Sequence, residues 1–176
     1  GVLAGNTLDF PEYYKNGLFV FDWSFGTMYY ISMTPDGSTY KGQKEEFLSG
    51  GSLPLTDGVA GDDGAMYFLT GGRRLESGMY RVFYNGEDKA KEVVSTPVTE
   101  EQNLRRKLES FASEGKGDLE LIWSSLQHLD RRIRYAARVA LEYQDAQIIQ
   151  ERLVAENNPS ILIQSAIALA RIGNQE

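Results

Sequence analysis

The chain has 176 residues, of which 41% are hydrophobic and 24% charged, so a packed core is feasible and extended disorder is excluded. A net charge of −7 argues against a nucleic-acid-binding protein, whose affinity depends on a basic surface that neutralises phosphates. Because the sequence has no cysteine, a single histidine (His128) and no apolar run near about 18 residues, we also exclude disulfides, covalently attached haem, a multi-histidine metal site and a membrane-spanning helix.

Residues 1–95 have the composition of strands and tight turns, since 16 of the 20 aromatic residues and 15 of the 18 glycines lie there. Turns are predicted over 34–38, where Pro35 presets φ and Asp36-Gly37 favours a positive φ, and over 61–64. The third predicted strand, over 40–48, is the most polar, so we place it near an edge of its sheet. Strands are predicted over 17–23, 26–33, 40–48, 57–61, 65–70 and 78–84.

The segments 18–33 and 65–84 look like two copies of one hairpin, which is typical of propeller blades. Residues 96–176 are rich in helix formers. Thr99, followed by two glutamates and Gln102, predicts a helix start with a capping box. Further helices are predicted over 118–129, 130–144, 145–156 and 159–173, with Asp130 and Asp145 as N-caps, Pro159 in a first turn and Gly173 as a C-cap.

The helical part repeats, because a shift of 28 residues superposes Ile133 on Ile161 and Ala140 on Ala168. The fold class predicted is therefore α+β, β then α: two propeller-blade-like antiparallel β units in residues 1–95, then an α-solenoid of HEAT-type helical pairs in residues 96–176.

The run "FDWSFGTMYYISMTPDGSTYKGQKEEFLSGGSLPLTDGVAGDDGAMYFLTGGRRLESGMYRVFY", with "DRRIRYAARVALEYQ" and "ALARIG", resembles a family of large secreted or periplasmic bacterial proteins. In that family a glucose/sorbosone-dehydrogenase-like β-propeller is followed by HEAT-type repeats and often by a haem-binding cytochrome c domain. The resemblance implies that this chain spans the last propeller blades and the first helical repeats. It also implies a periplasmic or secreted location, although no signal peptide is recognised in this segment.

Five residues are candidate ligand-binding positions, each with a structural alternative. Asp57 begins the innermost strand of a blade, where it would line a central channel for sugar hydroxyls or a cation, or else form an Asx-type turn or a blade-to-blade hydrogen bond. Arg73 and Arg74 follow paired glycines and would bind carboxylates, or else pair with Glu76 or a carbonyl. Asp22 and Trp23 place a carboxylate beside a ring, as in many sugar sites, or else are buried for packing.

The remaining motifs favour structural roles. The Asp-rich turns at 36–37 and 62–64 have too few ligands for a calcium loop. Arg131, Arg134 and Arg138 form a helical stripe that is predicted as a solvated or ion-paired face, with phosphate or partner binding as the alternative. His128, near a helix end, caps carbonyls or is exposed rather than binding haem or a metal.

Two functions follow from these features. The first is a non-catalytic scaffold or interaction segment that contacts other domains of the same polypeptide. The second, as an alternative, is part of the active-site channel of a quinone-dependent sugar or alcohol dehydrogenase. We favour the first, since two blade-like units supply too few residues for a catalytic channel and the only histidine lies in the helical part. The resemblance implies pyrroloquinoline quinone with calcium, and haem in a separate domain, for the parent protein, and we predict no cofactor in this segment.

A homodimer through the β region is also predicted, because an incomplete propeller would leave apolar faces open. These faces would carry Phe19, Phe21, Tyr29, Met66 and Phe68. A carbohydrate ligand is a further candidate partner.

Overall fold

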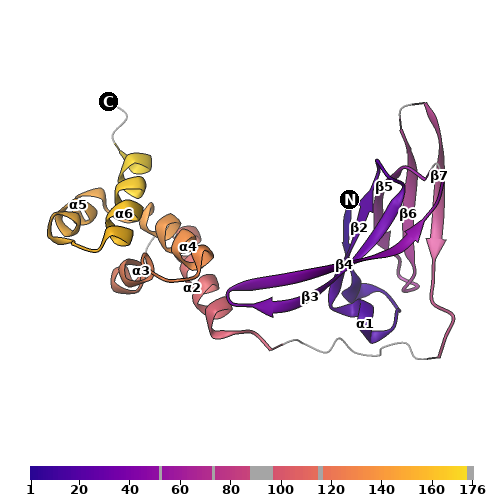
Figure 1. Cartoon of the computed structure of the whole chain (residues 1–176), viewed down its shortest axis with the longest axis horizontal. Helices are drawn as coiled ribbons and strands as arrows, with labels where there is room; N and C mark the ends of the chain where they lie inside the picture. The colour runs from indigo at the N-terminus through magenta and orange to yellow at the C-terminus, as the bar shows by residue number, and fades with distance from the viewer. Residues whose placement is uncertain (52, 73, 88–96, 115–116, 174–176) are drawn as a thin grey trace. The chain divides into compact units, whose positions relative to one another are not determined.

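The computed structural model describes every residue except 52, 73, 88–96, 115–116 and 174–176. The strands lie in the N-terminal half and all but one short helix in the C-terminal half, which confirms the α+β class (Figure 1). The chain divides into two compact units. The first, called the β unit, comprises 1–34 and 40–97, and the second, the helical unit, comprises 35–39 and 98–176.

The β unit contains two open antiparallel sheets. Sheet A has four strands in the order β1-β2-β3-β4, and the polar β4 lies at its edge as predicted. Sheet B has the order β5-β6-β7. The strands are β1 (Val2–Ala4), β2 (Gly17–Asp22), β3 (Thr27–Asp36), β4 (Thr39–Ser49), β5 (Leu55–Ala60), β6 (Met66–Gly72) and β7 (Leu75–Val82).

Two short elements between β1 and β2 were not predicted. They are the 3₁₀ turn η1 (Gly5–Thr7) and the helix α1 (Glu12–Lys15). Each is a single turn, too short to produce a hydrophobic periodicity in the sequence. They carry Leu8, Phe10 and Tyr14 onto sheet A, where the first two are buried.

Aromatic side chains from both sheets share one core. Phe19, Phe21 and Tyr30 of sheet A are buried together with Met66 and Phe68 of sheet B. The ring centroids of Phe21 and Phe68 are 6.4 Å apart, and Gly58 of β5 lies so close to Phe21 that a Cβ there would meet the ring. The inner faces of the two sheets therefore meet at Phe21 and Phe68, while Phe19 of sheet A packs against Phe10 and Tyr14.

This packing corrects one expectation about open propeller faces. Four of the five residues expected on them, Phe19, Phe21, Met66 and Phe68, are at most 5% exposed, and Tyr29 is partly buried. The exposed apolar face of sheet B is the opposite one. It is formed by Val59, Tyr67, Leu69, Met79 and Arg81, and we call it the outer face of sheet B.

The turn predicted over 34–38 is shorter than expected. Strand β3 continues through Pro35 to Asp36, and only Gly37, with φ of +55°, takes the left-handed conformation. Proline is tolerated near a strand end because a ladder hydrogen bond from its nitrogen is not required there. The residues 35–39 at this tip are instead held inside the helical unit.

The helical unit contains five described helices. They are α2 (Glu100–Glu114), α3 (Leu119–Ser125), α4 (Arg131–Leu141), α5 (Ala146–Ala155) and α6 (Pro159–Ile172). The predicted capping box is present, since Thr99 Oγ1 accepts from Gln102 N at 3.0 Å and Gln102 Oε1 accepts from Thr99 N at 3.2 Å. The Asp130 and Asp145 caps, Pro159 in the first turn and the Gly173 C-cap are confirmed.

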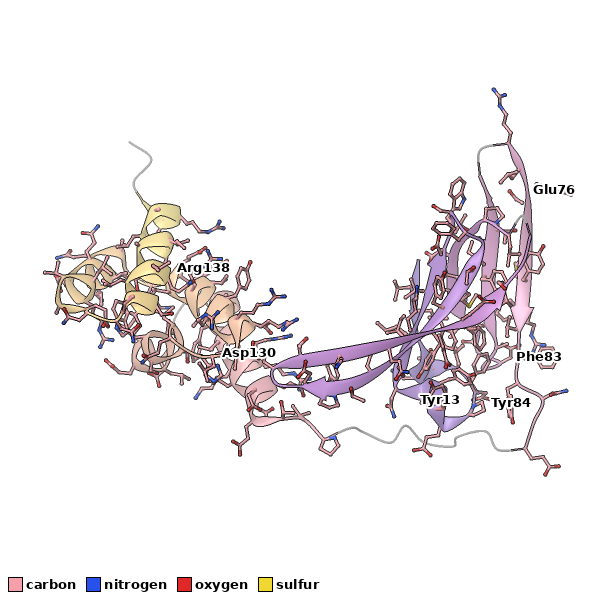
Figure 2. All side chains as sticks on the ribbon, in the orientation of Figure 1. Tyr13, Glu76, Phe83, Tyr84, Asp130 and Arg138 are labelled. Carbon is pink, nitrogen blue, oxygen red and sulfur yellow. The ribbon has the colours of Figure 1, made fainter. Side chains whose placement is uncertain are left out.

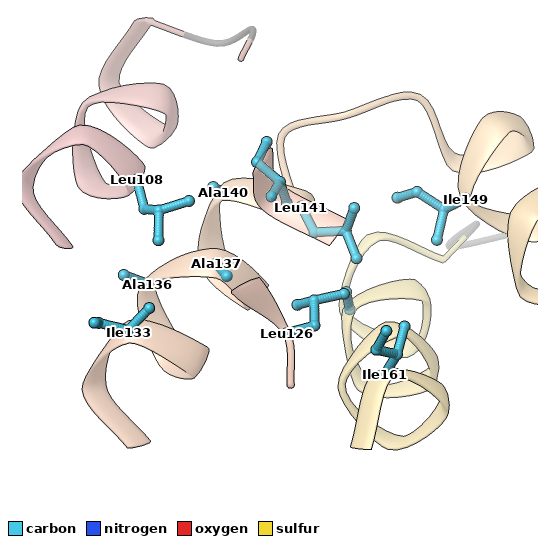
Figure 3. Packing of buried hydrophobic residues seen from close by; sticks show 11 residues of the cluster. Leu108, Leu126, Ile133, Ala136, Ala137, Ala140, Leu141, Ile149 and Ile161 are labelled. Atoms are coloured by element: carbon cyan, nitrogen blue, oxygen red, sulfur yellow. The ribbon is translucent and has the colours of Figure 1, made fainter. Parts of the chain in front are cut away.

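Small and branched aliphatic residues form the core of the helical unit (Figure 3). Helix α4 packs against α2, α3 and α6. Two of the position pairs related by 28 residues have matching environments, because Ile133 and Ile161 are both buried and Ala140 and Ala168 are fully buried. Two other pairs differ, since Val139 is partly buried where Ile167 is exposed, and Leu141 is buried where Leu169 is only partly buried. The sequence repeat therefore reflects a repeated packing position at the first two pairs only.

The hairpin tip is part of the helical unit through backbone contacts. The carboxylate of Asp130 accepts from Ser38 N at 3.0 Å, and Arg105 Nη1 donates to Ser38 O at 2.9 Å. Gln102 Nε2 donates to Thr39 O at 3.1 Å. Burial alone would raise the pKa of Asp130, but hydrogen bonds from Ser38 and from the Arg132 backbone outweigh burial and lower that pKa to about 2.

Candidate functional site

The loop after β2 forms the best-defined site in the β unit. Asp22 ends the strand, and its Oδ1 accepts from Ser24 N at 2.9 Å and Phe25 N at 3.1 Å, which makes an Asx-type turn. Gly26, with φ of +65°, then turns the chain back into β3. The carboxylate of Asp22 is thus used to shape the loop.

Trp23 joins this loop to sheet B. Its Nε1 donates to Gly71 O at 2.8 Å, and Gly72 lies beside the indole ring. Gly71 and Gly72 have φ of +148° and +108°, so a side chain at either position would be strained. The paired glycines therefore allow the end of β6 to approach the tryptophan.

A pocket of about 220 Å³ opens beside Trp23. Trp23 is 37% exposed and Phe25 79% exposed, so both rings are accessible. The described lining offers one hydroxyl and no ionisable side chain. It consists of Trp23, Ser24, Phe25, Gly26, Leu53, Pro54 and Leu75.

This lining suits stacking or apolar contact with a sugar or side chain and lacks a group for proton transfer. Trp23 was a sequence candidate, whereas Phe25, Leu53 and Leu75 were not. Leu53, between β4 and β5, and Leu75, at the start of β7, reach the pocket from other segments, and no local signal in the sequence indicates that proximity.

The other candidates are placed separately. Asp57 is exposed on β5 after a bulge, its Oδ1 accepts from Gly58 N at 2.9 Å, and it does not line the Trp23 pocket. Arg74 has φ of +70° next to Leu75, and its side chain has no hydrogen-bond or ion-pair partner within the part of the chain that the structure describes. Arg73 lies outside the described residues. Figure 2 shows Glu76 at the start of β7, away from Phe83 and Tyr84 beyond its other end.

A polar network on sheet B was not predicted. Asp63 Oδ2 accepts from Arg81 Nη2 at 2.7 Å and from Tyr67 Oη at 2.9 Å, while Oδ1 accepts from Ala65 N at 3.2 Å. The side-chain hydrogen bond from Arg81, and then that from Tyr67, lower the pKa of Asp63. The turn over 61–64 is confirmed, and its aspartate also fixes the two neighbouring strands to each other.

A cluster of rings around Tyr30 is structural. The Tyr30 hydroxyl donates to Tyr13 O, and Tyr13 Oη donates to Glu45 Oε2 at 3.1 Å. Burial, and then the proximity of Tyr13 and Glu45, raise the pKa of Tyr30 to about 12. A phenol with that pKa stays protonated at neutral pH and acts as a hydrogen-bond donor.

In the helical unit, the polar candidates make local contacts. His128 Nδ1 accepts from Asp130 N at 3.0 Å, and Arg134 Nη1 donates to Leu129 O at 2.8 Å. The Arg138 guanidinium lies 5.0 Å from the centre of the Tyr135 ring. Arg131 is separate from these contacts and faces a hollow described below.

Among the described residues, no cluster of three or more histidine, cysteine or acidic residues could hold a metal ion. No helix in the described ranges is long and apolar enough to cross a membrane. Comparison of the whole chain with protein-family models, with curated proteins and with solved structures finds no match in any of the three.

Proposed function

We propose that this chain is a non-catalytic scaffold and interaction segment of a multidomain secreted or periplasmic protein, joining the end of a β-propeller to HEAT-type helical repeats. The observation that carries the proposal is that each unit buries one apolar face and exposes a second. Such a double-sided arrangement is what an internal member of a stack of blades or repeats requires.

In the β unit, the second face is the outer face of sheet B. Val59 is 60% exposed, Leu69 50% and Met79 68%, although all three lie on paired strands. A propeller blade packs both faces against neighbours. The inner face of sheet B already contacts sheet A, so its outer face is where the next blade would pack.

In the helical unit, the second face is a stripe on α6 formed by Ile163, Ala166, Ile167 and Ala170, which we call the outer stripe of α6. Its members recur at helical spacing and are all exposed. The positions 28 residues earlier include Glu142, which pairs with Arg171 of α6 at 2.8 Å. Ala170 of the outer stripe corresponds to Glu142, so the stripe would receive a further helix near Ala170 as the end of α4 receives α6.

The Trp23 pocket fits the same function. Its described lining contains rings and aliphatic groups but no acid, base or nucleophile beyond one serine hydroxyl. It would hold an apolar group of a neighbouring domain or a carbohydrate, and it does not supply the proton acceptor that oxidation of an alcohol needs.

The test uses exposed apolar residues replaced by aspartate. Met79→Asp alters the outer face of sheet B, Ile167→Asp alters the outer stripe of α6, and Leu129→Asp is the control because Leu129 is 96% exposed outside both faces. Sedimentation velocity between about 1 and 100 µM covers the weak association expected of single open faces. We expect association of the wild-type chain to be reduced by Met79→Asp and Ile167→Asp and unchanged by Leu129→Asp.

A second measurement addresses the enzymatic alternative. The chain is titrated with pyrroloquinoline quinone and calcium, and binding is followed by calorimetry. We expect no saturable binding. Stoichiometric binding at about micromolar concentration, weakened by Asp57→Asn, would replace the scaffold proposal with the dehydrogenase channel.

A further inference from the structure

A hollow of about 440 Å³ lies between α2 and α4 in the helical unit, and its lining is mostly cationic. Three guanidinium groups face one carboxylate there, although the chain as a whole carries a net charge of −7. Its volume lies within the range of about 300–1,000 Å³ that is typical of ligand sites. We call this site the α2–α4 hollow, and it is lined by Arg105, Glu109, Arg131, Arg132 and Tyr135.

The arginine from α2 is held in place before any ligand arrives. Arg105 Nη1 donates to Ser38 O at 2.9 Å, and its Nε lies 3.0 Å from Glu109 Oε1. The hydrogen bond to Ser38 O restrains the guanidinium, so part of its side-chain entropy is already lost before binding. The contact with Glu109 also means that the single carboxylate of the hollow is already beside a cation.

The two arginines from α4 are uncommitted. Arg131 and Arg132 are exposed, and within the described ranges neither side chain has a hydrogen-bond or ion-pair partner. The nearest acid in sequence, Asp130, accepts hydrogen bonds from Ser38 N and from the Arg132 backbone, and it also interacts electrostatically with the charge of Arg132.

Other arginines of the helical unit do have partners. Arg152 pairs with Glu120, and Arg171 pairs with Glu142. Arg138 lies over the ring of Tyr135, which is itself 61% exposed at the hollow. The hollow therefore combines one fixed guanidinium, two free ones and an accessible aromatic ring.

We infer that the α2–α4 hollow binds a peptide segment bearing clustered carboxylates. Guanidinium forks match carboxylates geometrically, and Tyr135 adds a surface for the peptide backbone or an apolar side chain. Glu109 on the lining would repel a compact dianion such as phosphate. An extended peptide can place its carboxylates against Arg131 and Arg132 and an uncharged residue beside Glu109.

This inference goes beyond the scaffold function, because it names a ligand class and rests on the helical unit alone. The probe is a fluorescent hexaglutamate peptide, with hexaglutamine as the uncharged comparison and inorganic phosphate as a competitor. Binding to the full chain is followed by anisotropy at about 50 mM salt, where electrostatic binding is strong. We expect saturable binding of hexaglutamate and none of hexaglutamine.

The decisive comparison is between two double variants of equal charge change. Arg131→Ala/Arg132→Ala removes the free guanidinium groups and should weaken binding at least about tenfold, as expected for the loss of charged hydrogen bonds. Arg106→Ala/Lys107→Ala removes two exposed cations of α2 that do not line the hollow, and should weaken binding no more than about twofold through general electrostatics. Far-ultraviolet circular dichroism shows that each variant is folded.

Glu109→Gln should change the affinity for hexaglutamate in the opposite direction. Removing the only carboxylate of the hollow should tighten hexaglutamate binding severalfold. Equal weakening by the two double variants, absence of saturation up to about 1 mM peptide, or phosphate competing as well as the peptide would each overturn the inference. None of these results affects the scaffold proposal, which is tested on Met79 and Ile167.

Discussion

The two units build their cores from different side chains. In the β unit, Phe19, Tyr30 and Phe68 come from three strands and fill the space between two sheets. In the helical unit, Ala137, Ala140 and Ala168 are fully buried where helices approach closely. A core of large rings is most sensitive to lost volume, and a core of alanines to added volume.

The largest effect is expected from Phe19→Ala. Phe19 is fully buried, and its ring lies within 6.0 Å, between centroids, of Phe10, Tyr14, Tyr30 and Phe47. Loss of the ring leaves a cavity and should lower the free energy of unfolding of the β unit by about 3–5 kcal/mol. Urea unfolding followed by near-ultraviolet circular dichroism measures this change.

The helical signal at 222 nm serves as an internal reference for that experiment. If the units unfold separately, the helical transition stays where it is in the wild-type chain, and a parallel shift would show that they unfold as one. Phe25→Ala is the matched control. Its ring is 79% exposed, so its effect should stay within about 0.5 kcal/mol.

The opposite substitution tests the helical core. Ala137→Leu forces a larger side chain between α4 and its neighbours and should cost about 1–3 kcal/mol. Ala166→Leu makes the same change on the exposed outer stripe of α6, where it should be nearly neutral. Thermal unfolding at 222 nm distinguishes the two, and equal effects would contradict the assignment of buried and exposed helix faces.

The sequence predicts the helical unit more completely than the β unit, for a physical reason. Helix caps and periodicity are local, so Thr99, Asp130 and Asp145 could be recognised from a few neighbouring residues. The position of the hairpin tip in the helical unit could not be recognised in this way. It depends on Asp130 meeting Ser38, which is 92 positions away in the sequence.

In the β unit the strands were predicted but their packing was not. The alternation of side chains along β6 shows that Phe68 lies on one face of the strand, yet only the tertiary structure shows that sheet A covers this face at Phe68. The same limit applies to the candidate site, where Trp23 was recognised beside Asp22, whereas Leu53 and Leu75 come to it from distant parts of the sequence. In the arginine stripe predicted as solvated or ion-paired, Arg134 donates to Leu129 O and Arg138 Nε lies 3.9 Å from Glu142 Oε1. Arg131 is exposed at the α2–α4 hollow.

A smaller effect is expected at the cap where the hairpin tip meets α4. Asp130→Asn keeps an N-cap oxygen, but its amide cannot accept both the Ser38 and the Arg132 backbone hydrogens. The pKa of Asp130 is lowered from 3.8 to about 2, so the ionised carboxylate stabilises the fold above pH 3.8. That contribution is lost as the pH falls through about 2.

The measurement is chemical unfolding of Asp130→Asn and wild type at neutral and acid pH. Allowing for solvent screening, we expect a loss of about 1 kcal/mol at neutral pH that diminishes towards pH 2. Asp145→Asn is the control, because Asp145 caps α5 through Gln147 N and Ile148 N only. A loss at Asp130 that does not change with pH would mean that the carboxylate charge has no part in it.

The smallest effect concerns the exposed pair that joins the strands of sheet B. Arg81 Nη2 is 2.7 Å from Asp63 Oδ2, and the side chains are 43% and 41% exposed, so water and salt screen the interaction. Its stability contribution should be hard to detect, but the pKa of Asp63, which Arg81 and then Tyr67 lower, reports on it directly. Because the folded pKa is depressed, any stabilisation is present above the ordinary carboxyl pKa and disappears as the pH falls through the depressed value.

In an NMR titration, Arg81→Gln should raise the pKa of Asp63 towards its ordinary value, and Tyr67→Phe should raise it less. Added salt should also raise the pKa of Asp63 in the wild type. A pKa of Asp63 that does not change in Arg81→Gln would show that the pair does not persist in solution.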